Sequence, residues 1–273
     1  MTQKRILLTV AYDGTDFHGF AAQQGVRTVE GELARALAEA TGEQPEITGA
    51  SRTDTGVHAY GNLACFDTAS TIPAERFAQA LDQYLPEDVR VIASEEVSPD
   101  FHPRKTGWSK TYEYRILNTP RPDPLLRRTT CHYRSALDVA AMNAAAQHLV
   151  GTHDFTSFCS VHSLSPTRER TIYECSVSAE PAGLPLPTPG ALPLTPGALI
   201  TIRVTGSGFL YHMVRIIAGT LLDVGSGRLH PPDIHAILES RNRTRAGKTA
   251  EPQGLVLLGY HRTDSSGDTH RIA

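Results

Sequence analysis

Apolar positions in the first hundred residues repeat first with the period of a strand and then with that of a helix. Ile6 to Tyr12 reads as a strand, and apolar residues between 29 and 40 recur at helical spacing before Thr41-Gly42 ends the run. A strand is expected at 61–68, a helix opened by Pro73, and another strand at 89–93. We assign these segments to the β-α-β-β-α-β order of the ferredoxin-like arrangement, which has one more strand between its helices than is placed here.

The second half repeats this theme more loosely. Strands are expected at 110–117, 170–179, 199–205 and 254–261, and helices at 138–150, 208–224 and 231–240. We therefore predict an α+β fold with two domains, 1–107 and 108–273. The Pro/Gly-rich run at 181–198 is of low complexity and is expected to be a loop inserted in a hairpin.

The composition and the cysteine content indicate where in the cell the protein is expected to work. At 273 residues the chain fits two domains of ordinary size. No signal peptide is expected at its start, and no apolar run reaches the length of a membrane-spanning helix. The four cysteines are scattered and include no Cys-x-x-Cys pair, which favours reduced, structural thiols. We therefore expect a cytoplasmic protein with no membrane partner.

Charge is distributed unevenly although the net charge is only −3. Residues 1–107 carry 9 Lys and Arg against 16 Asp and Glu, whereas residues 108–273 carry 17 against 13. Such asymmetry favours a basic face confined to one half of the chain. A solvated surface without any partner could show the same imbalance.

The most informative segment is GASRTDTGVHA at positions 49–59. Asp54 stands between two threonines, with Arg52 before it and Gly56 after it. The entry and exit residues predict a tight loop between strands, where catalytic residues concentrate. A purely structural Asx-turn is the alternative. Asp54-Thr55-Gly56 is also the tripeptide of aspartic proteases, but that chemistry needs a second carboxylate and the motif does not recur.

Two later segments hold further candidates. Tyr112 and Tyr114 share one face of an expected strand, either to pack in the core or to offer a flat ring to a base. Arg215 lies amid an apolar stripe of the expected helix 208–224. A buried guanidinium there would need a charged partner, whereas a solvent-facing guanidinium would need none and would not indicate a functional site.

Four other patterns are weak evidence for the chemistry that they suggest. The turn at 206–208 lacks the third glycine of a dinucleotide-binding fingerprint, and Gly247-Lys248-Thr249 lacks the first glycine of a phosphate-binding loop. The spacing of His153, Asp154, Cys159 and His162 matches no common zinc pattern. The basic run from 241 to 248 is either a solvated face or a surface that meets phosphates.

In order and spacing, these segments resemble the bacterial tRNA pseudouridine synthase A family nearly end to end. The matching segments are Tyr12-Asp-Gly-Thr15 with Gly19, Arg27-Thr-Val-Glu-Gly31, Arg52-Thr-Asp54 continuing into Gly56-Val-His58-Ala59, Phe101-His-Pro-Arg104, Lys110-x-Tyr112-x-Tyr114, Gly151-Thr-His-Asp-Phe155, Gly208-Phe-Leu-Tyr-His-Met-Val-Arg215 and Gly254-Leu255. The family has an α+β fold with two halves around a central, mostly antiparallel sheet and an active-site cleft between the halves.

The resemblance implies an isomerase that converts uridine to pseudouridine at positions 38, 39 and 40 in the anticodon arm of tRNA. Asp54 would be the catalytic carboxylate that attacks the ribose. Tyr112 would stack on the base and assist proton transfer. Arg215 would pair with Asp54 and keep it ionised.

The resemblance also implies the binding partners. Arg52, Arg104 and His58 would contact the RNA near the extruded nucleotide. The family works as a homodimer on tRNA and uses no metal or organic cofactor. The chain departs from the family pattern at Ser51, at Phe20-Ala-Ala22 and at Lys105. Two alternatives remain. One is an RNA-binding protein without catalysis, which would have no need for Asp54 and Arg215 together. The other is an aspartic protease with a single Asp-Thr-Gly motif.

Overall fold

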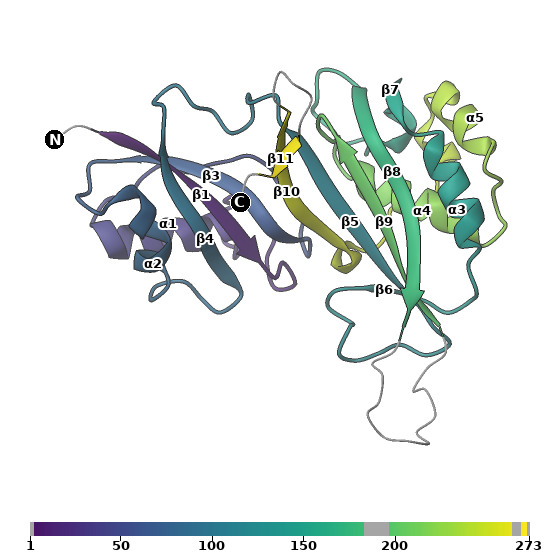
Figure 1. Cartoon of the computed structure of the whole chain (residues 1–273), viewed down its shortest axis with the longest axis horizontal. Coiled ribbons are helices and arrows are strands. Elements are labelled where there is room, and N and C mark those ends of the chain that lie inside the picture. The colour runs from purple at the N-terminus through teal and green to yellow at the C-terminus, as the bar shows by residue number, and fades with distance from the viewer. Residues whose placement is uncertain (1–2, 183–196, 264–268, 272–273) are drawn as a thin grey trace. The chain divides into compact units, whose positions relative to one another are not determined.

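The computed structural model describes residues 3–182, 197–263 and 269–271. The chain divides into two compact units: unit 1 contains residues 1–110 and 256–273, and unit 2 contains residues 111–255. The division expected from the sequence, at 107, grouped the last strand with the second half. In the structure this strand belongs to unit 1 from Val256 onward, because it pairs there with the strand that follows the Asp54 loop (Figure 1).

Unit 1 is built on a sheet in the order β4-β1-β3. The central strand β1 (Lys4–Tyr12) runs antiparallel to both β3 (His58–Thr68) and β4 (Val89–Val97). Two strands share the free side of β3. β2 (Thr48–Gly49) pairs antiparallel with Cys65 and Ala64, and β10 (Leu255–Thr263) pairs parallel with His58 and Ala59. The loop 50–57 that carries Asp54 joins β2 to β3.

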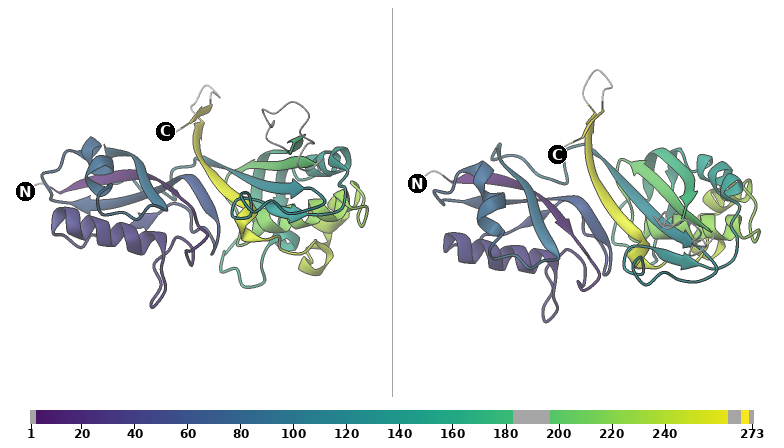
Figure 2. Two further views of the ribbon diagram at one scale, coloured as in Figure 1. Left: turned by 90° about the horizontal axis from the view of Figure 1, so that it is seen from below. Right: turned by 60° about the horizontal axis from the view of Figure 1, so that its bottom comes forward.

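The helices of unit 1 follow from capping and apolar spacing. α1 (Val29–Thr41) begins where the hydroxyl of Thr28 accepts the N–H of Gly31, and it ends at Gly42 with φ +73°. It runs along one face of the strands (Figure 2) and buries four apolar residues: Val29, Leu33, Ala36 and Leu37. A 3₁₀ turn (Ala74–Arg76) leads into the short α2 (Phe77–Leu81). With β2, which was not placed from the sequence, the elements run β1-α1-β2-β3-α2-β4, the ferredoxin-like order expected for this part of the chain.

Unit 2 has the strand order β5-β9-β8-β7. Its strands are β5 (Ser109–Asn118), whose first two residues lie in unit 1, β7 (Gly151–Asp154), β8 (Glu169–Pro181) and β9 (Ala198–Gly206). β6 (Cys131–Tyr133) pairs parallel with the end of β5. β8 and β9 are antiparallel up to Pro181 and Ala198, as expected of a hairpin. Residues 183–196 of the predicted insertion lie outside the described residues.

The helices of unit 2 are α3 (Val139–Gln147), α4 (Met213–Gly225) and α5 (Asp233–Ser240). α3 packs against α4 and against β8. The apolar stripe predicted along α4 is buried, with Ile216 and Ile217 fully inaccessible. The prediction that this helix begins at 208 is wrong. It begins at Met213, because His212 takes a left-handed conformation (φ +62°) that a helix cannot contain.

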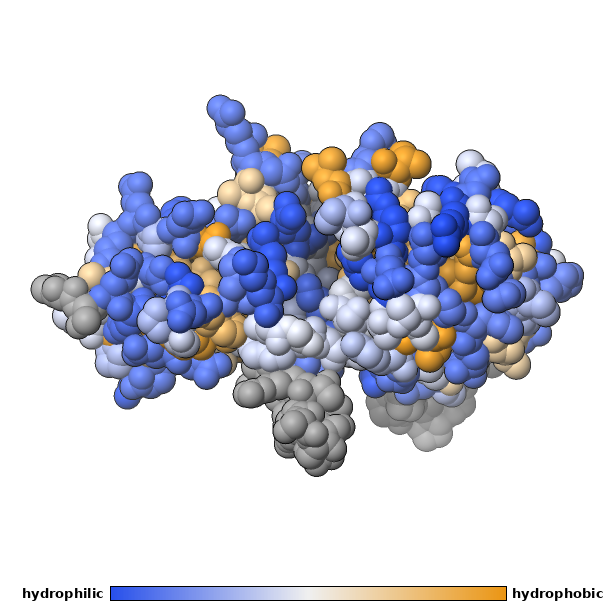
Figure 3. Space-filling model, turned by 90° about the horizontal axis from the view of Figure 1, so that it is seen from above, coloured by the Kyte–Doolittle hydropathy of each residue, from blue (hydrophilic) through white to orange (hydrophobic). Residues whose placement is uncertain are grey.

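The surface drawn in Figure 3 is mostly hydrophilic, with apolar residues in small separate spots. Shorter elements complete the chain: 3₁₀ turns at Thr156–Phe158, Arg243–Arg245 and Pro252–Gly254, and the strand β11 (Thr269–Arg271), which pairs with β10. Within the described ranges, every helix is too short or too polar to span a bilayer.

Candidate active site

Asp54 lies at the first position of a tight turn. The N–H of Val57 donates to the carbonyl oxygen of Asp54 at 3.1 Å, which closes the turn around Thr55 and Gly56. Gly56 has φ +77°, a backbone conformation that side-chain-bearing residues rarely adopt. The Asp54 residue is half-buried. The tight loop predicted between two strands is therefore confirmed, with Asp54 at its bend.

The segment entering the turn is held by a buried polar network centred on Asn62. The side-chain amide nitrogen of Asn62 donates to the carbonyl of Ser51 at 2.9 Å and to the hydroxyl of Tyr12 at 3.1 Å. Its oxygen accepts from the Tyr260 hydroxyl at 3.0 Å. Tyr12 in turn lies 2.7 Å from the hydroxyl of Thr53. These bonds fix the backbone immediately before Asp54.

Ser51, one of the expected departures from the family pattern, belongs to the same network. Its hydroxyl lies 2.7 Å from the hydroxyl of Tyr260, within hydrogen-bond distance. Tyr260 lies on β10, which returns to unit 1 from the far end of the sequence. The departure at Ser51 is therefore accommodated by a partner for its hydroxyl, and Tyr260 is 1% exposed.

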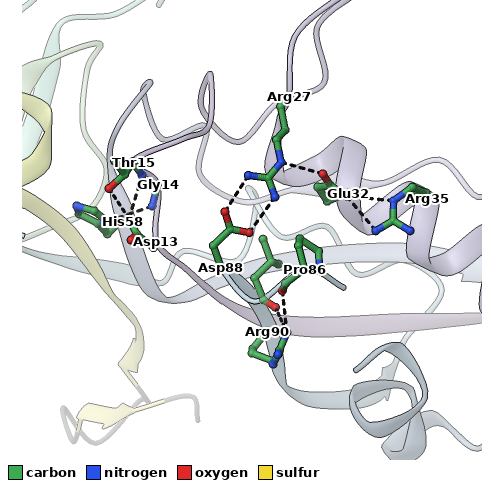
Figure 4. Close-up of polar contacts among 11 residues, drawn as sticks. Asp13, Gly14, Thr15, Arg27, Glu32, Arg35, His58, Pro86, Asp88 and Arg90 are labelled. Carbon is green, nitrogen blue, oxygen red and sulfur yellow. Dashed lines mark hydrogen bonds and ion pairs between the residues drawn. The ribbon is translucent and has the colours of Figure 1, made fainter. Parts of the chain in front are cut away.

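The segment leaving the turn rests on the loop that follows β1. The N–H of Gly56 donates to the carbonyl of Phe17 at 3.3 Å. The N–H of Gly14 donates to Nδ1 of His58 at 3.0 Å, and a carboxylate oxygen of Asp13 lies 3.1 Å from the same nitrogen (Figure 4). A Cβ at Gly14 would lie 2.0 Å from the carbonyl oxygen of Val57, so only glycine permits this approach.

His58 is 7% exposed and binds the loop after β1. Its position beside the turn agrees with its place in the motif, and its predicted contact with substrate stays a prediction. Two basic side chains hold the end of β2: Arg104 donates from Nε to the Gly49 carbonyl at 2.7 Å, and Lys110 from Nζ to the Ala50 carbonyl at 3.3 Å. Arg52, next to the turn, is exposed.

Tyr112 and Tyr114 lie in unit 2, on β5. Tyr112 is 8% exposed, and its ring meets that of Phe209 edge to face with centroids 5.2 Å apart. Tyr114 is fully buried and donates its hydroxyl to the Glu251 carbonyl at 2.8 Å. Burial raises the pKa of Tyr114, and the charge of Arg215 acts in the opposite direction. Tyr114 is therefore a packing residue, and Tyr112 is the more accessible of the two rings.

Arg215 lies in unit 2, in the first turn of α4. Its Nε donates to the carbonyl of Ala250 at 2.8 Å, and its own carbonyl accepts from the N–H of Ala250 at 3.0 Å. This double contact ties the start of the helix to the segment that precedes the 3₁₀ turn Pro252–Gly254. Arg215 is only partly exposed, and the backbone carbonyl of Ala250 holds its Nε.

The structure thus groups the predicted site residues by unit. Asp54, Arg52, His58 and Arg104 lie in unit 1, and Tyr112 and Arg215 lie in unit 2. The sequence did not single out the residues that support the turn, above all Phe17, Asn62 and Tyr260. One signal was available in the sequence, since Phe17 is a large apolar residue in an otherwise polar, glycine-containing loop.

The remaining patterns give no second site. His153 packs on the ring of Phe155 and binds the Val150 carbonyl. Hydrogen bonds from Thr156 lower the pKa of Asp154 even though its burial acts to raise it. Among the residues described, no three His, Cys, Asp or Glu side chains are grouped to hold a metal ion. Arg243 in the basic run bonds the carbonyl of Gly247 and is structural.

Comparison with known proteins gives one consistent family. The model of a family described as "tRNA pseudouridine synthase" matches residues 8–104 and 145–261. Proteins named "tRNA pseudouridine synthase A" are similar over most of their length. That of Bacillus pumilus is 44% identical over 93% of this chain and 97% of the relative. That of Ruminiclostridium cellulolyticum is 42% identical over 93% of this chain and 98% of the relative. That of Bacillus subtilis is 41% identical over 94% of this chain and 98% of the relative.

A solved structure, the CRISPR endoribonuclease Cse3 bound to RNA, covers 81% of this chain and 97% of its own. It is 13% identical with a TM-score of 0.18, values too low to indicate a shared fold.

Proposed function

The chain belongs to the tRNA pseudouridine synthase family, and we propose that it isomerises uridine to pseudouridine at positions 38, 39 and 40 in the anticodon stem-loop of tRNA. The observation that carries the proposal is the turn at Asp54. Both segments that flank this carboxylate are tied to buried parts of unit 1, by Asn62 on one side and by Phe17 on the other. Such support is what a nucleophile that must meet one atom of a large substrate requires.

Asp54 acts as the nucleophile. Its carboxylate attacks the ribose carbon of the target uridine, so that the bond from that carbon to the base nitrogen breaks and the base detaches. The base then turns and its C5 bonds to the same carbon, which breaks the bond to Asp54 and releases the carboxylate. The hydrogen at C5 leaves as a proton, and the nitrogen that was bound to the ribose takes up a proton. A carboxylate must be ionised to attack, so any cation that favours the charged form serves this step.

Arg215 supplies that cation, and Tyr112 supplies the ring on which the base stacks. A guanidinium cannot lose its proton at physiological pH and presents donors in a geometry that matches a carboxylate. The target nucleotide must leave its stack before its glycosidic bond can be reached. Arg52, Arg104 and His58 contact the RNA beside that extruded nucleotide, and the exposed position of Arg52 next to the turn is consistent with this role.

The chemistry calls for no metal or organic cofactor, because the substrate is only rearranged. We also propose that the protein is a homodimer on its tRNA and that it works in the cytoplasm. The excess of basic residues in 108–273 supports the dimer, since two copies would present two such faces to one tRNA. Sedimentation equilibrium should return twice the chain mass, and a monomer mass at micromolar concentration would contradict the dimer.

Mapping of the product tests the proposed positions. Unmodified tRNA transcripts with a single uridine at 38, 39 or 40 are incubated with the protein, and pseudouridine is located by carbodiimide adduct formation and primer extension. Each transcript should acquire one pseudouridine at its own position. Modification only outside the anticodon arm would contradict the proposed specificity while leaving the reaction type intact.

A further inference from the structure

The turn that carries Asp54 depends on a short segment, residues 13–18, that follows β1. Within this segment the carbonyl of Phe17 accepts the N–H of Gly56 at 3.3 Å, and the N–H of Phe17 donates to Gly14 at 3.1 Å. Gly14 in turn lies against Val57 and binds His58. Any shift of the 13–18 segment therefore moves the residues on the far side of the Asp54 turn.

Arg27 covers this segment from the other side. Its guanidinium carbon lies 4.1 Å from the centre of the Phe17 ring, a cation–π contact. The backbone carbonyl of Arg27 accepts the N–H of His18 at 2.9 Å. Arg27 thus touches the segment twice, through its side chain and through its main chain.

The guanidinium of Arg27 is itself fixed by two carboxylates (Figure 4). Nη1 and Nη2 donate to the two oxygens of Asp88 at 2.8 and 2.9 Å, and Nε donates to Glu32 on α1 at 2.9 Å. We call Arg27, Glu32 and Asp88 the Arg27 clasp. The hydrogen bond with Asp88 raises the pKa of Arg27, outweighing the opposite effect of burial. A guanidinium held at three nitrogens in this way has little freedom to move off the ring.

Asp88 closes the arrangement. Its backbone carbonyl accepts the N–H of Asp13, the first residue of the segment, at 3.0 Å. The next residue, Val89, begins β4 and pairs with Tyr12 at the end of β1. One residue therefore holds both the start of the segment and the side chain that covers Phe17.

We propose that Arg27 is a positioning residue: held by Asp88 and Glu32, it fixes the 13–18 segment and, through Phe17 and Gly14, the place of the Asp54 carboxylate. The inference rests on the proposed role of Asp54. It assigns a catalytic consequence to an ion-pair cluster that is partly exposed, with 36% of the Arg27 side chain accessible. Ion pairs of such exposure typically contribute little to stability, so an effect on turnover would have to arise from geometry.

The test compares Arg27→Gln with wild type and with Arg5→Gln, by kcat and KM on unmodified tRNA. Arg5 is a matched control in the same unit. It makes a bidentate pair with Asp67 at 2.7 Å and donates to the Phe101 carbonyl, and neither partner belongs to the 13–18 segment. We expect Arg27→Gln to lower kcat by roughly 10- to 100-fold, the range that a displacement of about 1 Å can cost. KM should stay within about twofold and Arg5→Gln should keep kcat.

Three results would overturn the proposal. They are an unchanged kcat in Arg27→Gln, an equal loss of kcat in Arg5→Gln, or a loss confined to KM, which would mean that Arg27 contacts the RNA. Asp88→Asn provides an independent arm if Arg27→Gln does not fold. It should lower kcat similarly, and the double variant should lose no more than either single one, because all three disable one clasp.

Arg27→Lys separates positioning from charge. Lysine keeps a cation near Phe17 but cannot bind Asp88 with two parallel bonds, so its kcat should lie between those of wild type and Arg27→Gln. Asp54→Ala in the same assay distinguishes the two failures. If Asp54→Ala stays active, the proposed role of Asp54 is wrong whatever Arg27 does. If Asp54→Ala is inactive and Arg27→Gln turns over like wild type, only the clasp is wrong.

Discussion

At the scale of single residues, the support of the Asp54 turn comes from buried polar side chains. Asn62 is fully buried. Its side-chain amide makes hydrogen bonds to the backbone N–H and the backbone carbonyl of Ser51 and to the hydroxyls of Tyr12 and Tyr260. An apolar side chain of similar size could make none of these bonds. Because the partners are buried, they would be left without compensation from water.

Asn62→Leu should therefore lower both stability and turnover. Each buried group left unpaired costs about 1–3 kcal/mol, so the free energy of unfolding should fall by at least about 2 kcal/mol in urea titrations. Turnover should fall as well at a temperature where the variant is folded, because the backbone before Asp54 loses its anchor. Asn143→Leu is the control. It removes one bond, to the N–H of Val177 in unit 2, and should leave turnover unchanged.

At the scale of elements, the pairing of β5 with β9 includes a buried carboxylate. Glu113 on β5 is 7% exposed and accepts from Arg203 on β9 at 2.6 Å and from Arg115 at 3.1 Å. Burial by itself raises the pKa of Glu113, but the hydrogen bonds from the two arginines outweigh it, so the pKa lies below its ordinary value. The charged form therefore stabilises the folded chain.

The pH dependence of stability follows from that direction. A carboxylate with a lowered pKa contributes stability that is complete above the pKa of the unfolded chain, about 4.3, and is lost as pH falls through the folded pKa. Glu113→Gln should cost roughly 1–3 kcal/mol at pH 7, and its difference from wild type should shrink below about pH 4. Chemical unfolding across pH measures this. Glu174→Gln, an exposed carboxylate on β8, should show no such pH-dependent gap.

Most elements could be predicted because their apolar period is set locally. The strand at β1, the helix from 29 to Gly42 and the hairpin around the insertion all agree with the structure. The start of α4 could not be predicted, because His212 adopts a left-handed backbone conformation that is not expected of histidine. β2 and β7 were missed because two and four residues are too few for a period to show.

At the scale of the whole molecule, the pairing of strands that lie far apart in the sequence could not be predicted from local patterns. β10 pairs with β3, almost two hundred residues earlier, and delivers Tyr260 to Ser51 and Asn62. Nothing local to residues 255–263 specifies that partner. The candidate site was recoverable at Asp54 from its motif, whereas the residues that hold it became visible only through the contacts of unit 1.

The central claim is that Asp54 attacks the ribose of a tRNA uridine, and tritium release tests it most directly. Forming the bond from ribose to C5 displaces the hydrogen at C5, so tRNA labelled there reports the chemistry itself. The measurement compares wild type with Asp54→Ala on the same labelled tRNA, after both are shown to be folded and to bind it. Wild type should release tritium and Asp54→Ala none above background. Release by Asp54→Ala at a rate near that of wild type would contradict the account.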